Sequence, residues 1–137
     1  MKLNAYLFFD GRCDEALEFY RTALGAEIQM LMRFKDNPDP HQSEMTPPGG
    51  ENKVMHATVR IGDSIIQASD GRCQGHPNFQ GFSLSLTVPD VAQAQKLFTA
   101  LAEGGKVHMP LAKTFFSPCF GMLADRFGVS WMVYVAV

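Results

Sequence analysis

The chain has 137 residues and a mass of 15.2 kDa, the size of one domain, and it can bury roughly two thirds of its unfolded surface without disulfides or a structural metal. Hydrophobic residues make up 46% and charged residues 19%, which excludes an intrinsically disordered chain. Lys and Arg number 12 against 14 Asp and Glu, without a basic stripe, so we expect no nucleic-acid partner.

The N-terminus and the cysteines predict a compartment. No secretory signal opens the sequence and no apolar stretch approaches the length of a membrane span, so no membrane partner is expected. Cys13, Cys73 and Cys119 are an odd number of thiols at wide spacings. This pattern indicates reduced cysteines in the cytoplasm.

The first half of the chain predicts a strand, a helix and three more strands. The helix has an apolar face from Cys13 to Leu24 and ends at Gly25. The last two strands flank Gly62–Asp63, which predicts a hairpin with a type II′ turn. Before them, residues 35–53 are rich in Pro and Gly and predict a long loop, either mobile or a lid. The strands are expected at residues 3–9, 26–34, 54–61 and 64–69.

The pattern then begins again after a linker at residues 71–81. A half-polar strand around residues 83–88 precedes a helix that Asp90 caps and Gly104–Gly105 end. Shifting the chain by 78 residues superposes the two halves in hydrophobic character. Three further strands are expected at residues 106–109, about 117–124 and 129–137.

This repeat predicts an α+β fold with two βαβββ modules and antiparallel-rich mixed sheets. A single domain, residues 1–137, would contain module one (1–70), the linker (71–81) and module two (82–137). Neither module has enough core alone, so the two share one sheet or pair across a dimer. Because open sheets leave edges that a partner can cover, we expect a homodimer.

Seven segments spread over nearly the whole chain carry a resemblance to known proteins. They are Tyr6–Tyr20, Val54–Ala57, Arg60–Asp63, Ser69–Asp70, Gly81–Leu84, Phe120–Met122 and Asp125–Met132. Together they resemble the PhnB-like branch of the vicinal oxygen chelate superfamily, which includes glyoxalase I, bleomycin-resistance proteins and extradiol dioxygenases. Members of the branch are often labelled 3-demethylubiquinone 3-methyltransferase-like. No glycine-rich loop for an S-adenosyl donor precedes a helix in this sequence, so that cofactor is not expected.

The resemblance also implies where a metal would bind. In the superfamily, the first and fourth strands of each module supply the ligands, and these positions fall on Ala5, Gln67, Ser83 and Met132 in this chain. Of the four, Gln67 alone is a plausible ligand, whereas an open catalytic site needs about three protein donors. We therefore expect no metal and no other cofactor.

His56 is the leading candidate for a site residue. Met55, Ala57, Val59 and Ile61 form the apolar face of their strand, so alternation places His56 on the polar face, which lines a cavity in the resembling family. A neutral imidazole there serves as a base or a ligand contact, or is simply hydrogen-bonded to neighbours at a cavity wall or dimer seam. His41, His76 and His108 are expected at the surface.

Further residues are expected around the same cavity. Gln67, Ser83 and Ser85 would provide neutral hydrogen-bonding groups or solvate an unused groove. Arg60 is expected either to clamp an anionic ligand or to lie exposed at a strand end. Phe115, Phe116 and Phe120 either roof an apolar pocket or pack in the core, and Cys119 is expected to be an inert buried thiol. The predicted ligand-binding set is His56, Gln67, Ser83, Ser85, Phe116 and Met132.

The function expected from these residues is metal-free binding of a small, partly apolar molecule in an aromatic-lined cavity. One alternative is an enzyme of the glyoxalase or dioxygenase type, which uses His56 or a metal at other positions. The other is a dimer whose groove is vestigial.

Overall fold

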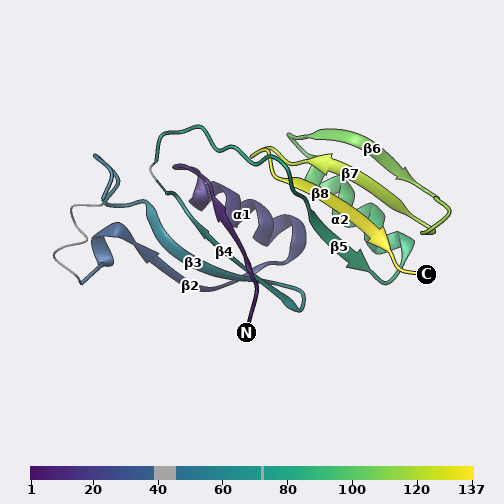
Figure 1. Ribbon diagram of the computed structural model, residues 1–137, viewed down its shortest axis with the longest axis horizontal. Coiled ribbons are helices and arrows are strands. Elements are labelled where there is room, and N and C mark those ends of the chain that lie inside the picture. The colour runs from purple at the N-terminus through teal and green to yellow at the C-terminus, as the bar shows by residue number, and fades with distance from the viewer. Residues whose placement is uncertain (39–45, 72) are drawn as a thin grey trace. The chain divides into compact units, whose positions relative to one another are not determined.

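A computed structural model describes residues 1–38, 46–71 and 73–137, and within them the fold is α+β, as predicted (Figure 1). The chain forms two compact units, residues 1–77 and 78–137, and the boundary lies inside the segment 71–81. The first unit contains β1 (Ala5–Phe8), α1 (Cys13–Leu24), β2 (Glu27–Arg33), the short 3₁₀ helix η1 (Phe34–Asp36), β3 (Val54–Ile61) and β4 (Ser64–Ser69). The second contains β5 (Leu84–Val88), α2 (Val91–Ala102), β6 (Lys106–Ala112), β7 (Phe120–Ala124) and β8 (Ser130–Val135). None of the described helices has the length and apolar character needed to cross a membrane.

Each unit is one βαβββ module with a mixed four-stranded sheet. The strand orders are β1-β4-β3-β2 and β5-β8-β7-β6. The first and fourth strands of each module pair in parallel, and the remaining pairs are antiparallel. The prediction of two βαβββ modules with antiparallel-rich sheets is therefore confirmed.

The turn signals in the first module act as predicted. Gly25 ends α1 with φ of +67°, and its N–H donates to the carbonyl of Arg21 at 3.1 Å. At the β3–β4 turn Gly62 has φ of +58°, and Asp63 is not among the described residues with positive φ. A type II′ turn requires positive φ at its first central residue only, so both observations agree with the prediction. Part of the predicted loop 35–53, residues 39–45 with His41, lies outside the described residues.

One face of each sheet is covered by its own helix. Ala57 and Val59 of β3 are fully buried, and so are Ala16 and Tyr20 of α1. In the second unit α2 buries Ala94, Phe98 and Leu101 against β7 and β8. Val91, the first residue of α2, is 40% exposed.

The 78-residue repeat holds for the helices but not for the first strands. It places Ala16 on Ala94 and Tyr20 on Phe98, and all four are buried. In the strands it places the buried Leu7 on the exposed Ser85, so the strand faces are one residue out of step. The connection from strand to helix is also longer in the first unit, residues 9–12, than in the second, residues 89–90.

Asp10 ties the start of the linker to the first unit. It has φ of +54°, a conformation that Asp tolerates better than most residues. Its carboxylate accepts from the backbone N–H groups of Gln74 (2.6 Å) and His76 (2.7 Å), and its carbonyl accepts from Gly75 (2.8 Å). The linker is therefore bonded to the β1–α1 connection.

Candidate functional site

The helix-free face of the first sheet, called the open face here, carries aromatic and polar side chains. Strand register fixes its membership: Tyr6 pairs with Gln67, and Gln67 pairs with Thr58. The alternate positions Leu7, Ala57 and Ala68 are buried on the helix side. The open face consists of Tyr6, Phe8, Met30, Met32, His56, Thr58 and Gln67.

His56 is bonded to a neighbour on this face. Its Nδ1 lies 3.1 Å from the hydroxyl oxygen of Tyr6, and the two ring centroids are 5.5 Å apart. The Tyr6 ring also lies 4.8 Å from the ring of Phe8, which is 57% exposed. Three rings from two strands therefore form an aromatic surface that reaches solvent.

Polar atoms on the open face remain available for a ligand. Within the described parts of the chain, Nε2 of His56, the amide of Gln67 and the hydroxyl of Thr58 have no hydrogen-bond partner. No buried side-chain nitrogen or oxygen in those parts lacks a partner, so these atoms are accessible to solvent. The predicted alternation of His56 against Ala57 and Val59 is correct, and Thr58 shares the face of His56.

Val54 departs from this alternation. Simple alternation along the strand would place it on the face of His56, but it is fully buried. The pairing of β2 with β3 shifts between Met32–His56 and Arg33–Val54, so Met55 is an extra residue in its strand. Such a bulge reverses the alternation before it, which the sequence pattern did not signal.

The implied metal position on the first strand was placed on the wrong face. Ala5 pairs with Ile66 of β4, which is 7% exposed and lies on the helix side. Tyr6 occupies the position beside Gln67. The error follows from the one-residue offset between the first strands of the two units, because a slip of one residue moves a side chain to the opposite face.

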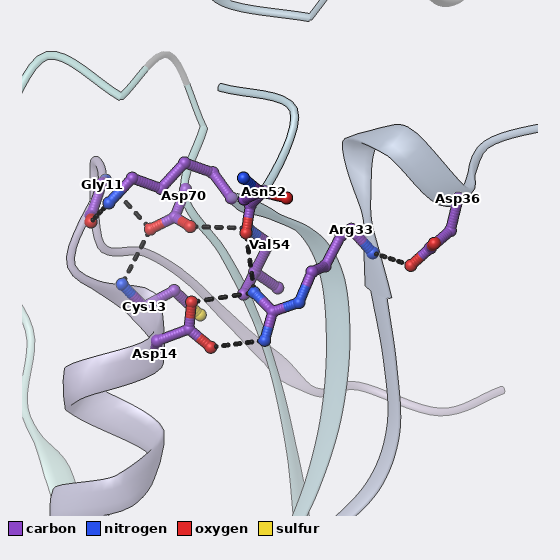
Figure 2. A network of polar contacts seen from close by, with 9 residues as sticks. Gly11, Cys13, Asp14, Arg33, Asp36, Asn52, Val54 and Asp70 are labelled. Atoms are coloured by element: carbon purple, nitrogen blue, oxygen red, sulfur yellow. Dashed lines mark hydrogen bonds and ion pairs between the residues drawn. The ribbon is translucent and has the colours of Figure 1, made fainter. Parts of the chain in front are cut away.

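A buried carboxylate, Asp70, holds together the segments behind the open face (Figure 2). One oxygen accepts from the N–H groups of Gly11 (3.0 Å) and Cys13 (2.7 Å), and the other accepts from Val54 (2.7 Å). These bonds join the end of β4 to the start of α1 and the start of β3. Because all three are made to main-chain donors, Asp70 acts as a structural anchor.

Arg33 strengthens the same corner from the protein surface (Figure 2). Its guanidinium donates to both carboxylate oxygens of Asp14 (2.9 and 3.0 Å) and to the carbonyl of Asn52 (2.8 Å).

Burial, with the nearby Asp70 and Asp14 carboxylates, raises the pKa of the Cys13 thiol well above its ordinary range. Cys13 is therefore a neutral core residue and no nucleophile.

The helix-free face of the second sheet carries methionine and serine side chains. Ser85 pairs with Met132, which pairs with Met122, and none of the three is buried. The opposite side meets α2, since a Cβ on Gly121 would lie 2.7 Å from the Phe98 ring. Ser83 precedes β5 and is half-buried.

An aromatic cluster extends this second face. The ring of Phe116 stacks on Tyr134 at 6.2 Å and meets Phe120 edge-on at 5.1 Å. Phe115 is fully exposed and Phe116 is 39% exposed, so neither packs in the core. Cys119 is buried, as expected, and Arg60 is an exposed strand residue paired with Glu27.

The predicted site residues therefore fall into two groups. His56 and Gln67 share the open face of the first unit. Ser85, Met132 and Phe116 belong to the second unit, together with Ser83. Tyr6, Phe8 and Thr58 were missed, although pairing of the first and fourth strands in parallel would have placed Tyr6 beside Gln67.

The residues present do not fit a superfamily metal centre. The described residues contain no group of three His, Cys, Asp or Glu side chains positioned to hold an ion. The carboxylate in register with the open face, Glu27, is paired with Arg60. One imidazole and one amide, without a free carboxylate or thiolate, are a poor set of ligands for a divalent metal.

One backbone N–H at the start of each described α-helix is bonded to a carboxylate of the chain itself. The Cys13 N–H donates to Asp70 at 2.7 Å, and the Gln93 N–H donates to Asp90 at 2.8 Å.

Comparison with known proteins identifies the family of this chain. The sequence model of a family described as 3-demethylubiquinone-9 3-methyltransferase matches residues 1–134. YjdN of Escherichia coli is 36% identical over 140 residues, which is 98% of this chain and 95% of YjdN. A crystal structure from Pseudomonas aeruginosa is 39% identical with a TM-score of 0.84, and covers 99% of this chain and 98% of its own.

Two further structures connect the family to a wider fold. A Bacillus cereus protein described as a putative 3-demethylubiquinone-9 3-methyltransferase, PhnB protein, is 30% identical with a TM-score of 0.81, and covers 99% of this chain and all of its own. A glyoxylase/bleomycin resistance protein/dioxygenase domain from Frankia shares the fold at 15% identity and a TM-score of 0.62, over 98% of this chain and 94% of its own. The chain therefore belongs to the PhnB-like family described as 3-demethylubiquinone-9 3-methyltransferase, which has the glyoxalase/bleomycin resistance/dioxygenase fold.

Proposed function

We propose that this protein binds a small, partly apolar molecule on the open face of its first sheet, without a metal. The observation that supports the proposal is the ring cluster of the half-buried Tyr6 and His56 and the exposed Phe8, beside unpartnered polar atoms. Ligand sites combine apolar and aromatic walls with a few polar groups that orient the ligand. The open face has this composition, and Gln67 and Thr58 supply the further polar groups.

A thermal-shift screen of small neutral aromatic compounds tests the proposal. A ligand present at 100 times its Kd stabilises the native state by about 2.7 kcal/mol, which raises Tm by roughly 8 °C for a domain of this size. In the His56→Ala variant the same ligand is expected to give a much smaller rise. The unliganded variant should lose about 1 kcal/mol of stability or less, since its bond to Tyr6 is only partly buried.

His108→Ala is the matched control, because His108 is an exposed histidine of β6 in the other unit. It should leave both Tm and the ligand-induced rise unchanged. Large destabilisation in His56→Ala with unaltered binding would show that His56 is structural and contradict the proposal. A face that binds none of the compounds would favour the vestigial groove.

Homodimer formation belongs to the same proposal. The edge strands β2 and β6 leave large apolar side chains exposed: Ile28, Met30, Val107 and Met109 are 37–45% exposed. Uncovered edges and apolar surface favour pairing with a second copy. Light scattering should give twice the chain mass of 15.2 kDa, and a mass of one chain at micromolar concentration would contradict it.

The absence of disulfides at all three cysteines supports a reducing, cytoplasmic setting.

A further inference from the structure

The hydrogen bond between Tyr6 and His56 limits which proton the imidazole can carry. The bond joins the Tyr6 hydroxyl to Nδ1 at 3.1 Å, and a neutral imidazole has one N–H donor and one acceptor nitrogen. A phenol hydroxyl is a stronger donor than a neutral imidazole N–H, and an unprotonated imidazole nitrogen is a stronger acceptor than a phenol oxygen. The favoured arrangement therefore has Tyr6 donating to Nδ1, which leaves the proton of neutral His56 on Nε2.

Nε2 is the ring nitrogen that reaches the solvent side. It has no partner in the described parts of the chain and is not buried. With the proton on Nε2, the open face presents an N–H donor beside the exposed ring of Phe8. A bound molecule is then expected to direct an acceptor oxygen at His56 and to lay its apolar body against the aromatic surface.

The charges of this face argue for a neutral ligand. The Arg60 guanidinium lies on the same side of β3 as His56, but it is paired with Glu27 in the facing position of β2. The other members of the open face, His56 aside, carry uncharged side chains. A carboxylate or ammonium ligand would therefore leave water without gaining an opposite unpaired charge.

We propose that the open face selects neutral aromatic compounds that carry a carbonyl oxygen, with Nε2–H of His56 as the donor to that oxygen and Tyr6 as the positioning residue that fixes the tautomer. This inference rests on the proposed function, because it names the ligand class of the same face.

Nitrogen-15 NMR of the histidine rings in the unliganded protein at pH 8 tests the tautomer by itself. At that pH an ordinary histidine is neutral. We expect Nε2 of His56 to show a protonated, pyrrole-type shift and Nδ1 an unprotonated, pyridine-type shift. The reverse assignment would overturn the inference without affecting the proposed function. His108 serves as the internal reference for a solvent-exposed ring.

Titration with acetophenone, ethylbenzene and benzoate tests the ligand class. Acetophenone and ethylbenzene differ by the carbonyl oxygen, so one additional hydrogen bond predicts about fivefold tighter binding of acetophenone. Binding is measured from the NMR shifts of the backbone amides of Tyr6 and His56. Benzoate is expected to bind more weakly than acetophenone. Tyr6→Phe, which keeps the ring, should reduce the preference for acetophenone, and His56→Ala should abolish it.

The outcomes separate the two claims. Equal affinity for acetophenone and ethylbenzene at the open face would support the proposed function and overturn the inference. Tighter binding of benzoate would overturn the neutral ligand class. Amide shifts absent from the open face with all three compounds would contradict the proposed function and this inference together.

Discussion

Replacing Asp70 by Ala should destabilise the fold more than removal of any surface carboxylate. The Asp70 side chain is fully buried and accepts three main-chain hydrogen bonds from Gly11, Cys13 and Val54 (Figure 2). The alanine variant leaves all three N–H groups without this acceptor. The affected segments are the start of α1 and the start of β3, which are separated by about forty residues of chain.

The expected loss follows from the three bonds. Hydrogen bonds to a charged group contribute about 1.5–3 kcal/mol each, so the lower figure gives about 4.5 kcal/mol for three. Gly11 is only half-buried, so water can replace part of its bond. We therefore expect a loss of about 4 kcal/mol in the free energy of unfolding, a large share of the roughly 5–15 kcal/mol typical of a domain.

Urea unfolding followed by circular dichroism measures this loss. Asp36→Ala is the matched control, because the Asp36 carboxylate also accepts a backbone N–H, that of Arg33 at 3.0 Å, but at an exposed position. It should cost less than about 1 kcal/mol. Asp70→Asn retains one acceptor oxygen and should fall between the two. If Asp70→Ala lost no more stability than Asp36→Ala, the anchoring role of Asp70 would be wrong.

Two further variants test the packing around the helices. Gly105→Ala should cost about 3 kcal/mol in urea unfolding, because its Cβ would lie 2.2 Å from the carbonyl oxygen of Ala124, and a loss below about 1 kcal/mol would contradict this contact. Burial raises the pKa of the Cys13 thiol in the folded protein. Above the ordinary thiol pKa near 8.5, this thiol therefore ionises in the unfolded chain but not in the folded one. The free energy of unfolding should then fall by about 1.4 kcal/mol per pH unit. Cys13→Ala should lack this component of the pH dependence between pH 8.5 and 10, and parallel curves for the two proteins would refute it.

The fold could be predicted from sequence because its signals are local. Gly25 after an apolar helix face, Gly62–Asp63 between two alternating strands, and Asp90 before a second helix each specify one boundary. The repeat of these signals predicted two βαβββ modules, and the observed order of elements agrees.

The site was predicted less completely because it depends on register between distant strands. Alternation within β3 was enough to place His56 on the face of the sheet that Ala57 does not occupy. The partner of His56, Tyr6, comes from a strand fifty residues earlier, and only the pairing of β1 with β4 brings the two together. Asp70 was missed as an anchor for the same reason, since its bonds reach backbone groups that sequence spacing does not bring together.

The central claim is that a small molecule binds the open face of the first sheet. The most direct test is a backbone amide NMR map of the protein with the strongest hit from the thermal-shift screen. We predict the largest shifts at Tyr6, His56 and Gln67, with smaller effects along α1 on the other side of the sheet. Shifts confined to the second unit or to α1, with the amides of Tyr6 and His56 unmoved at saturating ligand, would contradict the claim.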